Sequence, residues 1–250
     1  MLDSVLAEMI AAAAAEARDS VREDIPRFLS ARNITSLFHF TSITNLASIV
    51  ENGFLGREAL KNKKLEFTVS DQSRDEPILD GVCFSVSSPN NLMVANKVAF
   101  GFDMVLLELN GLEKILSNYN FVAIPGNFGS TLLKHKIQQW PEEFIGGQGL
   151  MNLFRNPEAR KKYNLSDWIP TDPQSEIILL EPLPWDFVKK IVFPFNTEYS
   201  TKEIIREIIR ILPKGVIVES QVSNVFQEID WKNEKIRDEY FERRWNETWD

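Results

Sequence analysis

The stretch that decides the fold reads ITSLFHFTSITNLASIVENGFL over residues 34–55. Residues 34–40 are rich in β-branched and aromatic side chains, which predicts a strand. Thr41-Ser42 then caps a short helix, because apolar side chains follow at helical spacing and Gly53 supplies a C-terminal stop. The end of a strand and the N-terminus of a helix should therefore meet near His39.

Further short strands are expected on either side of this unit, with few long helices between them. They cover residues 81–87, 103–109, 121–124, 176–180, 187–195 and 215–219. A helix should begin at Thr201, and residues 119–149, which carry five glycines, read as a long surface region. This pattern favours an α+β fold over a regular alternation of strands and helices.

The chain reads as one domain with an N-terminal appendage. Residues 1–30 predict a helix, since Asp3 can cap it and Ala11 to Ala15 are strong helix formers. No repeat and no Gly/Ser-rich or Pro-rich linker divides residues 31–250. The expected partition is therefore a helical appendage over 1–30 and one domain over 31–250.

Composition excludes several classes of protein. The 250 residues are 44% hydrophobic and 26% charged, as in an ordinary globular chain. One cysteine and two histidines nearly exclude a Cys/His zinc site, and no metal is expected. No export signal and no membrane segment are read, so the predicted location is the cytoplasm. With a net charge of −8, any contact with nucleic acid must come from a local basic patch.

Walker A, dinucleotide-binding and nucleophile-elbow motifs are absent from the sequence, which leaves three separated polar clusters. The first surrounds His39, which is either a buried core residue or a group beside a helix N-terminus that suits an anionic ligand. The second contains Arg74, which could equally pair with the acidic residues around it. The third ends in Glu176, which is either the solvated end of a strand or a functional carboxylate behind a loop with two prolines and Trp168.

The order of these clusters resembles the ADP-ribosyltransferase superfamily, whose members bind NAD in the cleft of a split β-sheet. Residues 37–55 and 82–93 more closely resemble two motifs of the DarT family, bacterial toxins that ADP-ribosylate bases in single-stranded DNA. The resemblance implies an ADP-ribosyltransferase-like split β-sheet core with peripheral helices. Two departures suggest a divergent branch. Ser85 stands where the family often has tyrosine, and Arg74 stands without the usual arginine cluster.

The resemblance also implies roles for individual residues. His39 would contact the adenosine-side ribose of NAD, and Thr41 and Asn45 would contact nicotinamide or phosphate. Phe84 and Ser85 would complete the NAD site, with Phe84 a candidate for stacking on nicotinamide. The catalytic pair would be Glu176, which stabilises the sugar cation, and Arg74, which meets the pyrophosphate or the acceptor. Gln174 would meet the acceptor base.

A single-stranded DNA partner requires basic and aromatic side chains together. The candidates are Lys134, Lys136, Arg155 and Trp168. Neighbouring residues 160–162 are also basic, although they could simply form a solvated helix face. The modified base would be guanine or thymine, and a DarG-like macrodomain antitoxin would be a second partner. Two alternatives stay open: a protein or RNA acceptor, and an inactive relative that only binds NAD or a partner.

Overall fold

The computed structural model describes residues 8, 10, 12, 13, 24–69, 80–90, 93, 94, 97, 101–126, 141–194 and 199–221. Most of the expected N-terminal helix lies outside the described residues. The same holds for three of the predicted site residues, which are Arg74, Lys134 and Lys136.

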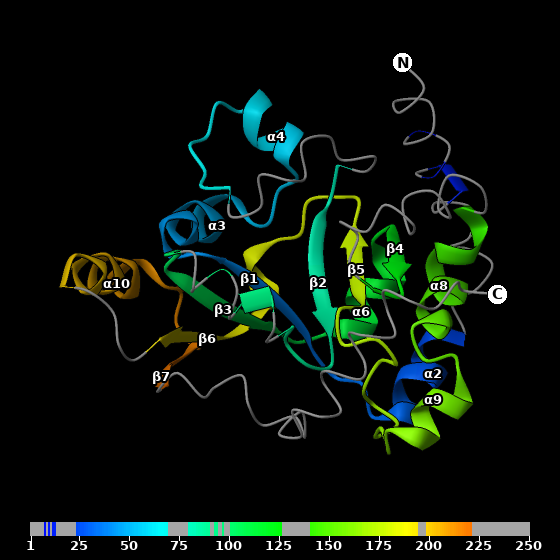
Figure 1. Ribbon diagram of the computed structural model, residues 1–250. Coiled ribbons are helices and arrows are strands. Elements are labelled where there is room, and N and C mark those ends of the chain that lie inside the picture. The colour runs from blue at the N-terminus through cyan, green and yellow to red at the C-terminus, as the bar shows by residue number, and fades with distance from the viewer. Residues whose placement is uncertain are drawn as a thin grey trace.

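The described residues form a mixed α+β structure (Figure 1). The strands are β1 Leu37–Ser42, β2 Val82–Val86, β3 Met104–Leu109, β4 Phe121–Ile124, β5 Glu176–Leu179, β6 Val188–Pro194 and β7 Ile217–Gln221. The helices are α2 Asp24–Arg32, α3 Leu46–Asn52, α4 Arg57–Asn62, α6 Leu112–Asn118, α8 Gly146–Asn152, α9 Pro157–Lys162 and α10 Tyr199–Ile211. Three short 3-10 turns are η1 Ile43–Asn45, η2 Pro141–Phe144 and η3 Trp185–Phe187. The predicted α+β class is therefore confirmed, and every predicted strand is present with its ends shifted by a few residues at most.

All seven strands belong to one sheet, in the order β4-β5-β2-β1-β3-β6-β7. Neighbours are antiparallel except β6 and β7, which are parallel. The register between β1 and β2 covers only two pairs, Leu37↔Val86 and Phe38↔Ser85. On its other side, β1 pairs with β3 along its whole length to Ser42. The strand β1 thus stays with β3 and departs from β2 beyond Phe38, which splits the sheet.

Apolar side chains cover both faces of the sheet. The larger core joins the face that carries Leu37 and Leu107 to residues of α2, α3, α6, α8 and α10. Ile25 and Leu29 place α2 within this core. A smaller cluster on the other face joins Val122 and other residues of β4 and β5 to η2. Figure 1 shows α2, α8 and α9 gathered beside β4, with α3 and α10 toward the opposite end of the sheet.

Two local expectations were wrong. Residues 141–149 are not a surface region, because η2 and α8 pack against β4 and bury Phe144 and Ile145. Gly149 allows α8 to lie close to η2, since an added Cβ would overlap the Phe144 carbonyl oxygen. The expected helix at Thr41-Ser42 begins later: η1 precedes α3, and the Ser42 side chain makes no capping hydrogen bond.

Candidate functional site

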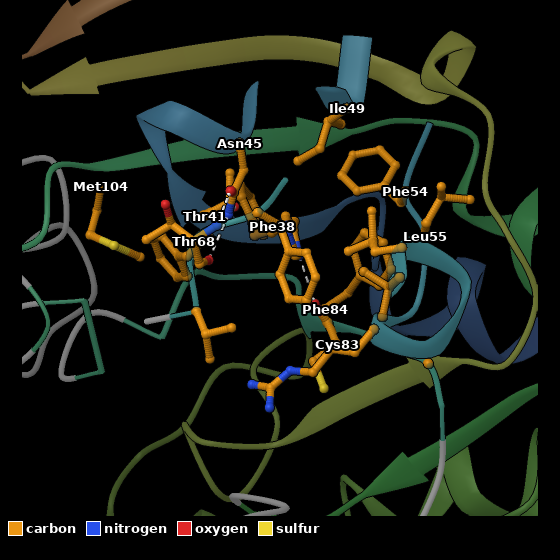
Figure 2. Close-up of a pocket in the computed structure, with 18 of the residues that line it drawn as sticks. Phe38, Thr41, Asn45, Ile49, Phe54, Leu55, Thr68, Cys83, Phe84 and Met104 are labelled. Atoms are coloured by element: carbon orange, nitrogen blue, oxygen red, sulfur yellow. Dashed lines mark hydrogen bonds between the residues drawn. The ribbon is translucent and has the colours of Figure 1, made fainter. Parts of the chain in front are cut away.

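A cavity lies where β1 and β2 separate (Figure 2). Residues 38–41 of β1 and 81–85 around β2 all line it. Successive side chains of a strand point to opposite faces of a sheet. Consecutive lining residues on both strands therefore mean that the cavity opens between the strands and not on one face alone.

The cavity brings together side chains that the register places on opposite faces. Phe38, Ser85 and Glu176 lie opposite one another on adjacent strands and share one face. His39 is the next residue along β1, so it belongs to the other face. Both His39 and Glu176 line the cavity, although 137 positions separate them in the sequence. Thr41, Asn45, Phe84 and Ser85 also line it.

His39 is held by aromatic rings and by the backbone of β2. Its ring centroid lies 5.2 Å from that of Phe54 and 5.3 Å from that of Phe84. Nδ1 lies 2.9 Å from the Cys83 carbonyl oxygen, and because a carbonyl only accepts, Nδ1 carries the proton. Burial lowers the pKa of His39 to about 4, and the bond to Cys83 opposes this shift only partly. The imidazole is therefore neutral at pH 7, with Nε2 as a hydrogen-bond acceptor.

This half-buried imidazole predicts an acid-sensitive stability. The pKa is about 4 in the folded protein against 6.5 for an exposed histidine, so the unfolded chain takes up the proton first as the pH falls. The free energy of unfolding should therefore decrease between pH 6.5 and pH 4, by about 3 kcal/mol from this residue. Urea unfolding of the parent and of His39→Asn at pH 7 and pH 4 measures this difference. An equal loss in both proteins would contradict it.

Asn45 does not point its amide at a ligand. Nδ2 donates to Thr41 Oγ1 at 3.0 Å and to the Thr68 carbonyl oxygen at 2.9 Å. Oδ1 accepts from the Thr68 backbone N–H at 2.7 Å. Figure 2 shows Thr41, Asn45 and Thr68 grouped together, with Ile49, Phe54 and Leu55 elsewhere around the cavity. The contact of Asn45 with nicotinamide or phosphate stays a prediction, and its amide is already bonded to three groups within the protein.

Phe84 is a poor stacking surface for a ligand. Its side chain is 1% exposed and packs against Phe54, with ring centroids 5.4 Å apart, as well as against His39. Three half-buried aromatic rings also line the cavity and leave more surface for a planar group: Phe38, Phe40 and Phe67. These three rings offer more surface for stacking than Phe84 does, and the contact of Phe84 with nicotinamide stays a prediction.

Glu176 begins β5 between β2 and β4, opposite Ser85 on one side and Ile124 on the other. It is only 3% exposed, so the interpretation as a solvated strand end was wrong. The preceding loop turns at Asp172, whose Oδ1 accepts from the Gln174 backbone N–H at 2.7 Å. Gln174 is half-buried and is not among the residues that line the cavity.

Among the described residues, two cationic side chains line the cavity, those of Arg57 at the start of α4 and Lys97. Sequence reasoning missed both. Arg57 lies two residues after Leu55, the end of the first motif, and this proximity was the available signal. No motif lies near Lys97 in the same way. With Glu176, they place basic and acidic side chains around one cavity.

The predicted DNA-binding residues within the described part of the chain lie away from the cavity. Arg155 is exposed, and Trp168 packs partly buried against the core. The Arg160 guanidinium donates to the backbone carbonyls of Ser166 and Ile169, at 2.8 and 2.7 Å, and so holds the loop that carries Trp168. Of the three basic residues of α9, only Lys161 and Lys162 form an exposed basic pair.

Across the described residues, no helix is long and apolar enough to cross a membrane. No cluster of three or more His, Cys, Asp or Glu side chains within that part of the chain could hold a metal ion.

Comparison with known proteins identifies solved structures only, since no family model and no curated protein matches the chain. Thermosipho africanus DarTG in complex with ADP-ribose matches at a TM-score of 0.48 and 13% identity, over 74% of this chain and 49% of that chain. Thermus sp. 2.9 DarT in complex with ADP-ribosylated ssDNA matches at 0.44 and 14% identity, over 75% and 93%. The same protein with NAD⁺ matches at 0.43 and 14%, over 75% and 95%.

This chain spans about half the length of the Thermosipho africanus chain that it matches. The matched structures come from the DarT family, which the sequence motifs also resemble. At identities of 13–14% and TM-scores below 0.5, no function can be transferred from them. The chain is similar to these DarT structures.

Proposed function

We propose that the chain is an NAD-dependent ADP-ribosyltransferase that modifies a guanine or thymine base in single-stranded DNA. The observation that carries the proposal is that His39, Thr41, Ser85 and Glu176 line one cavity in the split sheet. A split sheet with these residues in this order was implied by the sequence motifs alone. The choice of DNA as acceptor rests on those motifs.

The lining residues suit the chemistry of NAD. The pyrophosphate carries two negative charges, and Arg57 and Lys97 supply cations. The neutral His39 offers Nε2 as an acceptor for a ribose hydroxyl. The half-buried ring of Phe38 lies on the same face of the sheet as Glu176, where it could stack on a planar ring. Arg74 stays a proposed pyrophosphate or acceptor contact.

In the proposed reaction, the bond between C1′ of the ribose and the nicotinamide nitrogen breaks, and nicotinamide leaves with the electron pair as a neutral molecule. Positive charge develops on the sugar, and the Glu176 carboxylate stabilises it. A preorganised charge in a water-poor site acts more strongly than the same charge in water. A nitrogen of the acceptor base then forms the new bond to C1′ and releases its proton to Glu176 or to water.

The proposed DNA contacts lie outside the cavity. Arg155, Lys161 and Lys162 are exposed and could meet phosphates, and Lys134 and Lys136 are proposed to contribute to the same interaction. Trp168 is half-buried, which leaves part of its ring for a base. A toxin role in the cytoplasm, with a DarG-like macrodomain antitoxin as partner, completes the proposal.

Labelled NAD incubated separately with single-stranded DNA, RNA and total protein tests the proposed function. Label on DNA alone is the expected result, and label on RNA or protein would reassign the acceptor. Binding of NAD without transfer to any of them would identify an inactive relative. Absence of both binding and transfer would refute the proposal.

Gln174→Ala should lower transfer to DNA much more than hydrolysis of NAD to free ADP-ribose. Gln174 does not line the cavity but lies two residues before Glu176, so only the step that uses the acceptor should be affected. The matched control is Gln148→Ala, because Gln148 bonds within α8 to Asn152. Rates of both reactions are measured with each variant, and equal losses in the two reactions would place Gln174 in the donor site.

A further inference from the structure

We infer that Asn45 is a positioning residue that fixes one wall of the cavity and thereby sets the affinity for the donor. The wall segment is residues 65–69, which follow α4 without forming a helix or strand. Three of its residues, Phe67, Thr68 and Val69, line the cavity. The inference about affinity rests on the proposed function, whereas the structural role of Asn45 does not.

Asn45 holds the wall segment as a neighbouring strand would. Its amide bonds both the N–H and the carbonyl of Thr68, at 2.7 and 2.9 Å, which is the pair of bonds that one strand residue exchanges with another. Its second N–H reaches Thr41 Oγ1 at 3.0 Å, inside β1. One side chain thus connects β1, the η1 turn and the wall segment.

A second, weaker connection runs beside it. Thr44 Oγ1 lies 2.8 Å from Thr68 Oγ1 and 2.8 Å from Ser42 Oγ, so hydroxyl groups extend the link between the turn and Thr68. Thr44 and Thr68 are both exposed, and water can replace these contacts. The Asn45 bonds to Thr68 are also exposed, but one rigid amide holds both backbone atoms of Thr68 at once, whereas the hydroxyl link holds only its side chain.

The consequence for binding follows from the population of the binding-competent state. A ligand that needs the wall in place binds more weakly in proportion to the fraction of molecules in which the wall is released. If loss of the Asn45 bonds leaves the wall in place in about one molecule in ten, the apparent Kd rises about tenfold. The chemical step should change little, since Glu176 is held in β5 and does not depend on the wall.

Two measurements on Asn45→Ala test the inference. Hydrogen exchange of the Thr68 amide, which donates to Asn45 Oδ1, should accelerate by tenfold or more. The Kd for NAD, measured by calorimetry, should rise by about tenfold, with kcat within about twofold of the parent. Asn52→Ala is the matched control: that amide bonds Ser48 within α3, and neither quantity should change. Thr44→Val should accelerate exchange less than Asn45→Ala.

The outcomes separate the inference from the proposed function. Unchanged exchange at Thr68 in Asn45→Ala would show that Asn45 does not hold the wall. Faster exchange with an unchanged Kd would show that the wall does not set donor affinity. If Asn52→Ala changed the exchange rate and the Kd by the same amounts, the effect would come from a general destabilisation of α3 and not from the Asn45 bonds. If the parent itself binds no NAD, the proposed function fails and the claim about affinity fails with it, while the exchange experiment still decides the structural claim.

Discussion

Glu176→Gln should lower the rate of ADP-ribose transfer by about 10²–10³-fold, as loss of one preorganised group at a developing charge does in other enzymes. Glutamine keeps the shape of the side chain and removes the negative charge that would face the sugar cation. Glutamine is preferred to alanine because Glu176 is 3% exposed, so truncation would leave a gap in β5. Truncation of Glu176 to alanine should therefore lower the free energy of unfolding by more than the roughly 1 kcal/mol or less that is typical of surface substitutions.

The effect is measured as the initial rate of labelled product on single-stranded DNA, at equal concentrations of folded protein. Glu158→Gln is the control, since Glu158 is an exposed residue of α9. Its rate should equal that of the parent. Urea unfolding of both variants shows whether a lower transfer rate reflects loss of folded protein. Near-parental transfer by Glu176→Gln would remove the reason to call this carboxylate catalytic.

Gly53→Ala should destabilise the fold by about 3 kcal/mol. Gly53 ends α3 with φ at 75° and ψ at −168°, a conformation that alanine rarely adopts. An added Cβ would also lie 2.5 Å from the Leu183 carbonyl oxygen. That oxygen accepts a hydrogen bond from the Phe54 N–H at 2.8 Å, within an isolated β-bridge between Phe54 and Leu183. A shift that relieves the overlap would therefore also disturb the ring contact between Phe54 and His39.

The free energy of unfolding in urea measures this effect. Gly101→Ala separates the two causes, because Gly101 also has a positive φ, 84°, but no atom of the described residues lies within 4 Å of an added Cβ. Gly101→Ala should lower the free energy of unfolding by only about 1 kcal/mol, from backbone conformation alone. Equal losses at the two positions would mean that contact with Leu183 contributes nothing.

Much of the fold could be predicted from local pattern. The apolar run that became β5 and the aromatic stretch that became β1 are strand-like on their own residues, and Gly53 was a recognisable helix stop. Local pattern does not show which strands become neighbours. A solvated strand end and a functional carboxylate both stayed open for Glu176, because nothing in its own segment places β5 between β2 and β4.

The candidate site was predictable where a motif carried it and not where it depended on distant contacts. The set of His39, Thr41, Phe84 and Glu176 does line one cavity. The partner of Asn45 could not be inferred, because Thr68 lies 23 positions away in a segment without secondary structure. Lys97 was also missed, because no motif in the surrounding sequence distinguishes it from an ordinary surface lysine.

The most direct test of the central claim is the mass of a single-stranded oligonucleotide after incubation with NAD and the purified protein. The account predicts a mass increase of one ADP-ribose unit per modified base, with an equal amount of nicotinamide released. The increase should be lost with Glu176→Gln and kept with Glu158→Gln. An oligonucleotide of unchanged mass at full NAD occupancy of the protein, or an equal increase with Glu176→Gln, would contradict it.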